Sequence, residues 1–459
     1  MDELIRASAV EVVGHLARGE VRPAELLELL AARIAAVDPA VNALPTLAWE
    51  RAREARPVAP LHGLPVAIKD LTETRGVRTT HGSPIFADHI PAADDHVVQR
   101  IEAAGGAIYA KSNTPEFGAG GQTFNAVFGI TCNPWNTALT PAGSSGGAAV
   151  ALKTGMAWLA HGSDLGGSLR NPASFCGIVG LRPSPGRVPK GPAADPWNSL
   201  SVEGPMARTV ADVALFLDAM SGFDPREPLS LPAPATPYLA AAQAPRLPRR
   251  VAFSADLGGF TPVDPEVAAI CAAAAERLAG LGVTVEEASP DFTGAHEAFQ
   301  TLRALGFATG HAGHLREHRD KLKEDVVWNI EKGLALTGAE VGEALRLRGA
   351  LMARMRGFFA TYDLLLCPAT IVPAFPVEQR FVEACAGVRF QTYIDWLAVA
   401  YAITLTGHPA LSLPCGFTAG GLPVGLQMVG GWQGEAALLS HAGALEAELA
   451  LDPAPIDPR

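Results

Sequence analysis

The chain has little cysteine, little charge and no long apolar run. Its 459 residues include six cysteines, Cys132, Cys176, Cys271, Cys367, Cys385 and Cys415, and no two of them form a Cys-x-x-Cys pair. Cysteines spaced in this way are typical of a protein in a reducing compartment, where they act as small apolar side chains. No apolar run approaches the ~18 residues of a membrane span. The amino terminus is acidic and no basic-then-apolar signal segment follows it, so we expect a cytoplasmic protein.

The composition is that of a well-buried globular protein. Hydrophobic residues make up 48% of the chain and charged residues 18%, which argues against disorder. The net charge of −11 argues against nucleic acid or an anionic membrane surface as the main partner. One basic cluster, Arg246, Arg249 and Arg250, lies in a proline-rich stretch and is interpreted as solvated surface.

Two serines, Ser144 and Ser168, stand among glycines in the segments 143–147 (GSSGG) and 162–170 (GSDLGGSLR). Glycine lets the backbone turn sharply and lets a second molecule approach the main chain. A serine on such a turn can expose its hydroxyl where N–H groups converge. Acyl transfer needs this pairing of an attacking oxygen with donors for the oxyanion. By itself, however, Ser168 could be a turn residue whose hydroxyl caps a helix.

Upstream, Lys69 ends an apolar run in the segment 63–70 (GLPVAIKD). A solvated lysine is a poor base, but a desolvated amine loses its proton near neutral pH and can then accept one. The alternative is an ordinary lysine paired with its neighbour Asp70. Because successive strand residues point to opposite faces, we expect Asp70 to point away from the amine.

These segments, in this order, resemble the amidase signature family. The resemblance covers most of the chain and is far more specific than one Gly-Ser cluster. The other matching segments are 111–117 (KSNTPEF), 128–129 (FG), 133–135 (NPW), 170–173 (RNPA), 180–183 (GLRP), 409–416 (PALSLPCG) and 421–427 (GLPVGLQ). The resemblance implies an α/β/α fold, with a mixed central sheet covered by helices on both sides. It also implies one domain over 1–459, with the signature core at about 60–220 and a variable substrate-specificity region at about 290–400.

By this resemblance, the family's Ser–cis-Ser–Lys triad falls on Ser168, Ser144 and Lys69. Ser168 would be the nucleophile and neutral Lys69 the general base. Ser144 would follow a cis peptide bond and relay a proton between them. No metal or other cofactor is expected.

The resemblance also implies the surroundings of the nucleophile. Asp164 and Arg170 bracket Ser168 and are expected to pair and to brace its loop. Leu165 stands where the family often has Thr, but the role there belongs to a backbone N–H, so we expect activity to survive. Main-chain donors to the oxyanion are expected from Leu165, Gly166, Gly167 and Ser168. Room for substrate is expected beside the small residues Gly118, Ala119, Gly120 and Gly121.

Another hydrolase pattern overlaps the first cluster. Gly143-x-Ser145-x-Gly147 fits the nucleophile elbow of α/β-hydrolases, which would make Ser145 the nucleophile. That elbow must follow a hydrophobic strand, whereas the polar segment 137–141 ends in a proline here. The elbow interpretation is therefore disfavoured. A phosphate-binding loop is disfavoured too, because no Gly-Lys-Ser/Thr follows.

Local patterns predict alternating strands and helices, as in βαβ units. A capping box at Ser8 should open a helix ending near Gly19, and Pro23 should begin a second helix. The alanine- and proline-rich stretch 225–248 is interpreted as a surface loop within one domain. Strands are expected at 64–68, 107–110, 156–160, 250–253 and 410–415, and further helices at 97–104, 148–153 and 265–281.

Some candidate residues have simpler interpretations. His311, His314 and His318 share one helical face, but no cysteine accompanies them and the stretch is charged, so a solvated face is favoured over a metal site. Four aromatic residues could line a substrate pocket or fill the core: Trp328, Phe390, Tyr393 and Trp396.

The sequence therefore predicts an amidase that hydrolyses a linear carboxamide through a serine acyl-enzyme. Its partner would be a small-molecule amide, with no nucleic acid and no membrane, and a homodimer is compatible with the sequence. One alternative is the A subunit of a glutamine-dependent tRNA amidotransferase. That subunit commonly carries Gln after the motif arginine, whereas Asn171 stands here. An allophanate hydrolase would need an extra carboxy-terminal domain, for which little chain remains. Another alternative is a catalytically silent scaffold of the same fold.

Overall fold

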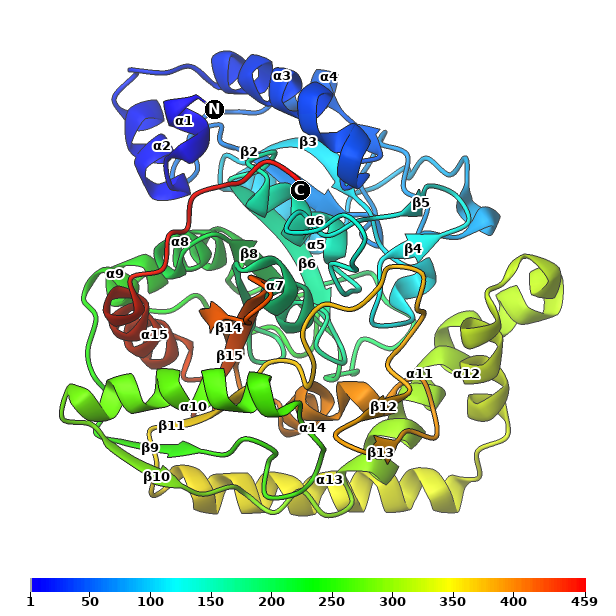
Figure 1. Cartoon of the computed structure of the whole chain (residues 1–459). Coiled ribbons are helices and arrows are strands. Elements are labelled where there is room, and N and C mark those ends of the chain that lie inside the picture. The colour runs from blue at the N-terminus through cyan, green and yellow to red at the C-terminus, as the bar shows by residue number, and fades with distance from the viewer. Residues whose placement is uncertain (1) are drawn as a thin grey trace.

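The computed structural model describes residues 2–459 and is built around one mixed sheet. Figure 1 shows this sheet in the middle of the molecule, with helices packed around it. Its strand order is β1-β3-β2-β6-β8-β7-β14-β15-β11-β9-β10. Its strands are β1 (Thr46–Leu47), β2 (Pro65–Lys69), β3 (Ala107–Ser112), β6 (Leu159–Asp164), β7 (Val179–Arg182), β8 (Val202–Ala207), β9 (Arg250–Phe253), β10 (Thr284–Glu287), β11 (Leu364–Pro368), β14 (Ala410–Phe417) and β15 (Pro423–Gly430). The short strands β4 (Phe124–Asn125) and β5 (Gly129–Ile130) pair with each other, as do β12 (Ala384–Cys385) and β13 (Val388–Arg389).

Fifteen α-helices and four short 3-10 helices connect or cover the strands among the described residues. The α-helices are α1 (Glu3–Arg6), α2 (Ala9–Ala17), α3 (Pro23–Val41), α4 (Trp49–Arg53), α5 (His96–Ala103), α6 (Gly146–Lys153), α7 (Arg170–Cys176), α8 (Val210–Met220), α9 (Tyr238–Gln243), α10 (Pro265–Gly280), α11 (Ala295–His318), α12 (Glu324–Leu334), α13 (Gly338–Phe359), α14 (Ala398–Thr406) and α15 (Glu435–Leu449). The 3-10 turns are Pro84–Phe86, Glu116–Gly118, Arg319–Lys321 and Asp395–Leu397.

Alternation along the strands separates two hydrophobic cores. On β11, Leu364 and Leu366 join the larger core, which includes side chains of α10 and α15. Leu365 and Cys367, on the opposite face, join a second core with side chains of α11, α13 and α14. Period-two alternation therefore buries both faces of the sheet, which confirms the expected fold class.

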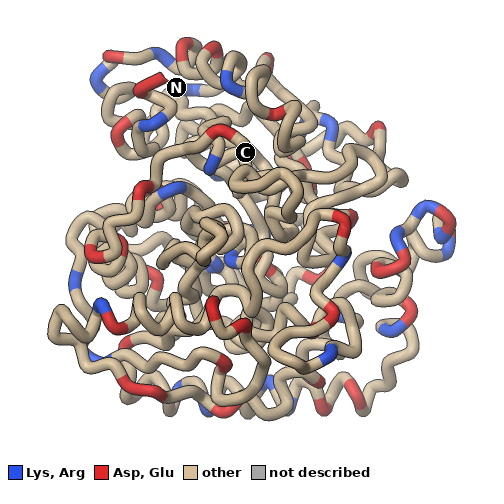
Figure 2. Tube along the Cα trace, in the orientation of Figure 1, with Lys and Arg blue, Asp and Glu red and all other residues tan. Residues whose placement is uncertain are grey.

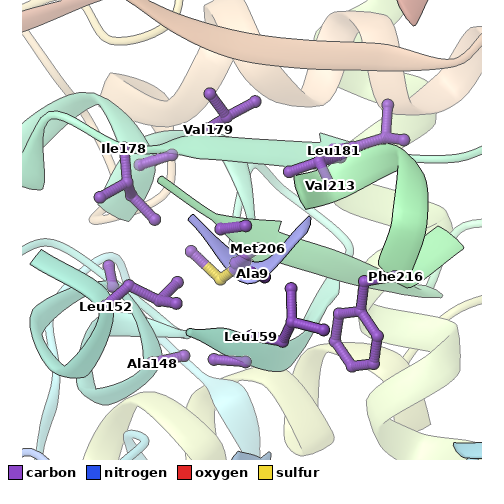
Figure 3. Packing of buried hydrophobic residues seen from close by; sticks show 14 of the residues in the cluster. Ala9, Ala148, Leu152, Leu159, Ile178, Val179, Leu181, Met206, Val213 and Phe216 are labelled. Carbon is purple, nitrogen blue, oxygen red and sulfur yellow. The ribbon is translucent and has the colours of Figure 1, made fainter. Parts of the chain in front are cut away.

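The first half of the sheet is packed in the same way. Figure 3 shows Ala148 and Leu152 of α6 and Val213 and Phe216 of α8 packed around strands β6, β7 and β8. Charged residues, in contrast, lie mainly along the outer helices and loops, with both signs interspersed in the view of Figure 2. No helix within residues 2–459 has the length and apolar character needed to cross a membrane.

Most predicted elements are confirmed, with two corrections. The capping box of Ser8 and Glu11 opens α2, and Pro23 begins α3. The bounds of the strand predicted at 156–160 are wrong, because β6 begins at Leu159 and continues to Asp164 in antiparallel pairing with β8. The stretch 225–248 is not loop throughout: it contains α9, whose Tyr238 is buried.

The topology brings the signature segments together. Strand β2, which ends at Lys69, pairs in parallel with β6, which ends at Asp164. Helix α6 begins at Gly146, directly after the first serine cluster, and α7 begins at Arg170, directly after the second. Both serine clusters therefore lie at element ends beside the carboxyl end of β2.

Candidate active site

Lys69 is fully buried and its amine is surrounded by hydroxyl groups. Its Nζ lies 2.7 Å from Ser144 Oγ, 2.9 Å from Ser145 Oγ and 3.0 Å from Ser163 Oγ. Burial lowers the pKa of Lys69 to about 7, while the carboxylates of Glu203 and Asp164 act in the opposite direction. A substantial fraction of the amine is therefore neutral, with a lone pair available, near neutral pH.

Asp70 turns away from this amine, as expected from strand alternation. Its carboxylate accepts a hydrogen bond from the Thr80 N–H at 3.1 Å and another from the Thr80 hydroxyl. It also faces the charge of Lys111, which opposes the rise in the pKa of Asp70 caused by burial. Lys69 therefore does not form an ion pair with the adjacent Asp70.

The backbone of the first serine cluster packs closely against a neighbouring segment of the chain. The Gly143–Ser144 peptide bond is cis. A Cβ on Gly143 would lie 2.8 Å from the Gln122 carbonyl group, so the close approach requires glycine here. Ser145 is fully buried, and its hydroxyl also donates to the Ser163 carbonyl at 3.3 Å. No strand precedes this turn, as the prediction against the nucleophile elbow requires.

Ser168 lies in the wall of a small cavity of about 100 Å³, which it shares with Ser144. It is partly exposed, in contrast to buried Ser144, so its hydroxyl can be approached from the cavity. Of the other predicted site residues, the ones that line this cavity are Gly118, Gly120, Leu165 and Gly166.

The remaining loop residues are used differently. Gly167 has φ +105°, and its N–H donates to Asp164 Oδ1 at 3.0 Å, so this donor is already engaged. The Ala119 carbonyl accepts from the half-buried Lys323 amine at 2.6 Å. Neither Gly167 nor Ala119 lines the cavity. The N–H groups of Gly166 and Ser168, in contrast, donate no hydrogen bond to any described residue.

A buried ion pair holds the turn that carries Ser168. Arg170 Nη2 lies 2.8 Å from Asp164 Oδ1, and both side chains are fully buried. The same carboxylate accepts from the Leu169 N–H at 3.1 Å and lies 3.3 Å from Arg182 Nη1. Burial by itself would raise the pKa of Asp164, but Arg170 and Arg182 hold it well below its usual range. The carboxylate thus stays ionised and ties the two ends of the turn together.

Helix α11 contributes three cavity-lining residues that local sequence reasoning did not single out. Phe299, Arg303 and Phe307 are spaced four residues apart, so they share one face of the helix. Phe117 also lines the cavity. The periodic spacing was available as a signal in the sequence, but nothing local indicates which face of a long helix meets the site.

The four candidate aromatics do not line this cavity. Trp396 packs behind the 118–121 loop, since a Cβ on Gly121 would lie 2.1 Å from its ring. The Tyr393 hydroxyl accepts from Arg303 at 2.8 Å, and Trp328 packs against the Tyr393 ring. Trp396, Tyr393 and Trp328 thus contact the residues that line the cavity or their neighbours. Phe390 is partly buried and packs against the second core.

The face of His311, His314 and His318, predicted to be solvated, is only partly so, because all three side chains are half-buried. The His311 ring packs 4.3 Å from that of Phe117, and burial lowers the pKa of His311 to about 4. His314 stacks on the same phenyl ring. Within residues 2–459, one group of side chains is able to hold a metal ion: Glu73, His81 and His89, of which His81 lies 6.4 Å, ring to ring, from the same Phe117.

A wider channel of about 380 Å³ adjoins the small cavity and shares Ser163, Arg303 and Phe307 with it. The rest of its wall combines apolar side chains with charged ones. The charged residues there are Asp95, Lys190, Asp195 and Glu203.

Comparison with known proteins identifies the family. A model of the amidase family matches residues 25–439. The chain is 36% identical over 456 residues to an acylamidase of Rhodococcus erythropolis, covering 96% of this chain and 95% of that protein. It is 35% identical over 468 residues to the A subunit of glutamyl-tRNA(Gln) amidotransferase from Synechococcus sp. (strain WH7803), covering 94% and 95% of the two. The solved structure of a bacterial aryl acylamidase superposes with a TM-score of 0.91 at 27% identity over 97% of each chain. The chain therefore belongs to the amidase signature family, and this membership supports amide hydrolysis.

Proposed function

We propose that this protein hydrolyses a linear carboxamide to a carboxylate and an amine through a covalent intermediate on Ser168. One observation carries the proposal: the buried Lys69 amine lies 2.7 Å from the Ser144 hydroxyl, and Ser144 shares its cavity with Ser168. A base, a hydroxyl and an accessible second hydroxyl in this order are what a proton relay needs.

In the proposed first step, neutral Lys69 takes the proton of the Ser144 hydroxyl, and Ser144 takes that of Ser168. The Ser168 oxygen attacks the amide carbon, and the carbonyl π electrons move to its oxygen. That oxyanion accepts hydrogen bonds from the main chain at Leu165, Gly166 and Ser168. Gly167 is left out because Asp164 engages its N–H.

The relay then reverses. The Lys69 ammonium returns its proton through Ser144 to the leaving nitrogen as the C–N bond breaks. Water, activated by the same relay, attacks the acyl-enzyme and releases the carboxylate. No step needs a metal or a redox cofactor, because every proton has a donor and an acceptor among these three side chains and water.

The amidotransferase subunit is the second candidate, favoured by the 35% identity to such a subunit. Its activity would depend on partner subunits, whereas an amidase acts alone. Incubation of the purified chain with aliphatic and aryl amides, and separately with glutamine, distinguishes the two. Turnover of amides without partners supports the proposal. Exclusive glutamine hydrolysis that requires added subunits would replace it with the second candidate.

A fluorophosphonate probe tests the mechanism and also the silent-scaffold alternative. Such probes attach covalently to an activated serine, so we expect the adduct on Ser168. Ser145→Ala is a matched control, because Ser145 contacts the same lysine at 2.9 Å but is fully buried. This variant should still be labelled. An unlabelled wild-type protein would indicate a silent scaffold.

A further inference from the structure

The guanidinium of Arg303 is a cation in the wall of the small cavity without a carboxylate partner. Arg303 lies on α11 and is 6% exposed. It donates to the Asn329 side-chain carbonyl and, at 2.8 Å, to the Tyr393 hydroxyl. The rings of Phe307 and Tyr393 lie 4.6 and 5.5 Å from its Cζ. All these partners are neutral, and no ion pair to Arg303 within 4.0 Å occurs among residues 2–459.

This environment differs from that of the other buried arginines of the molecule. Arg170 and Arg182 share the carboxylate of Asp164. Arg187 lies 3.6 Å from the carboxylate of Glu435, and Arg208, which lacks a carboxylate partner, donates to the main-chain carbonyls of residues 6 and 7. Arg303 has neither kind of partner and faces the cavity. Since burial of an unpaired charge is costly, buried cations are normally matched by an anion.

Two carboxylates of the surrounding segments, those of Asp325 and Asp395, contact other side chains. Asp325 lies 3.2 Å from Lys323 Nζ, and Asp395 accepts hydrogen bonds from Thr392 and Gln300. Lys332 adds further positive charge, because it donates to Gln300 on the same helix as Arg303. Neither carboxylate forms an ion pair with Arg303, so its charge in the cavity wall lacks a counterion among the described residues.

The outer channel carries charges of both signs. Asp195 and Glu203 line it, as do Arg303 and Lys190, and the Lys190 amine donates to the main-chain carbonyls of Asn198 and Ser201. Asp95 also lines it, but burial raises the pKa of Asp95 to about 8, so this carboxyl is mostly protonated near neutral pH. Arg303 therefore lies where the small cavity and the channel meet.

From this arrangement we propose that Arg303 binds a carboxylate at the far end of the acyl half of the substrate. Because Arg303 shares the small cavity with Ser168, the substrate would be the monoamide of a short dicarboxylic acid, whose amine leaves through the wider channel. This inference rests on the proposed function, because it places the acyl half beside Ser168. The planar guanidinium, with donors still unused, can hold a carboxylate bidentately.

The test compares anilides of equal chain length. Glutaric acid monoanilide carries the terminal carboxylate, and its methyl ester removes the charge. A site built to pair with a polar group discriminates strongly against an analogue that lacks it, so wild-type enzyme should prefer the acid by roughly 100-fold or more in kcat/KM. Arg303→Met should abolish that preference, because kcat/KM for the acid should fall far more than kcat/KM for the ester. Arg303→Lys, which keeps the charge without the planar fork, should restore part of it.

Lys332→Met is the matched control. It removes a neighbouring positive charge that does not line the cavity, so it should retain the preference for the acid. If the preference for the acid fell equally in Arg303→Met and Lys332→Met, it would result from the summed positive charge of the region. That outcome would overturn the assignment to Arg303.

The outcomes separate this inference from the proposed function. Hydrolysis of the ester and acid at equal rates by wild-type enzyme overturns the role of Arg303 but leaves the amidase proposal standing. A preference for a carboxylate on the aniline half overturns the placement of the acyl group. If no anilide is hydrolysed and no probe labels Ser168, the proposed function fails, and calorimetric binding of glutarate to wild-type and Arg303→Met protein still tests the site. Equal glutarate binding by both proteins would then overturn it.

Discussion

The amine of Lys69 lies 2.7 Å from the Ser144 hydroxyl, whereas the next residue, Asp70, turns its carboxylate to Thr80. This separation keeps a carboxylate from stabilising the ammonium at close range. Burial then dominates the pKa of Lys69 and lowers it to about 7. The chemistry proposed for the site follows from this one arrangement.

The first prediction concerns the pH dependence of the reaction. A protonated lysine has three donors and no acceptor, so it cannot start the relay. Because the pKa of Lys69 is about 7, kcat/KM for a neutral amide should fall as the pH drops through 7 and reach a plateau above it. Lys69→Ala and Lys69→Met should each remove this limb together with most of the rate. Steady-state kinetics between about pH 5 and pH 9 measure this limb, because that range brackets the pKa of Lys69. Near-wild-type kcat/KM with the same limb in either variant would mean that another base acts.

The second prediction concerns the nucleophile. Ser168→Ala should abolish acyl-enzyme formation and lower kcat on the order of 10⁴-fold or more, because cooperating residues lose their function together. Mass spectrometry of the protein after brief mixing with substrate detects the acyl-enzyme. Ser145→Ala tests the neighbouring hydroxyl. If its loss abolished the adduct while Ser168→Ala kept it, the nucleophile-elbow interpretation would be correct.

Removal of metal ions is expected to leave the activity unchanged. The group formed by Glu73, His81 and His89 could hold an ion, but none of the three lines the cavity of Ser168. Dialysis against EDTA followed by an amide hydrolysis assay measures the effect, with His89→Ala as a second measure of the same independence. A large loss that added zinc restores would show that a metal takes part.

Much of the fold was predictable because its signals are local. The Ser8 capping box and Pro23 mark helix starts through contacts within one turn, and the structure confirms both. The glycines at 143 and 162–167 likewise indicated a close backbone approach. Strand β6 was misplaced because its polar half, from His161 to Asp164, looks like a loop in sequence. Only its pairing with β8, distant in sequence, extends it to Asp164.

Residues brought to the site by tertiary packing were less accessible. Arg303 lies far from every signature segment, and its spacing from Phe299 and Phe307 indicates a shared helix face without indicating what that face meets. The same limit explains His311, whose charged neighbours suggested solvent. The Phe117 ring that covers it comes from a different segment of the chain.

The last prediction concerns the buried ion pair below the Ser168 turn. Asp164→Asn should destabilise the protein by about 3–5 kcal/mol, because it leaves the buried charges of Arg170 and Arg182 without their counterion. It should also lower kcat, since the carboxylate holds the N–H groups of Gly167 and Leu169 and so fixes the turn.

Urea unfolding and steady-state kinetics on the same preparations measure the two effects. The matched control is the exposed pair of Arg250 and Glu286, whose charged atoms lie 2.8 Å apart on the surface. Glu286→Gln should change the unfolding free energy by less than about 1 kcal/mol, because solvent screens such a pair, and it should leave kcat unaltered. If Asp164→Asn kept wild-type kcat under conditions in which it remains folded, the brace would stabilise the fold without positioning Ser168. Because Asp164 bonds two N–H groups of the very turn that carries Ser168, we expect both quantities to fall together.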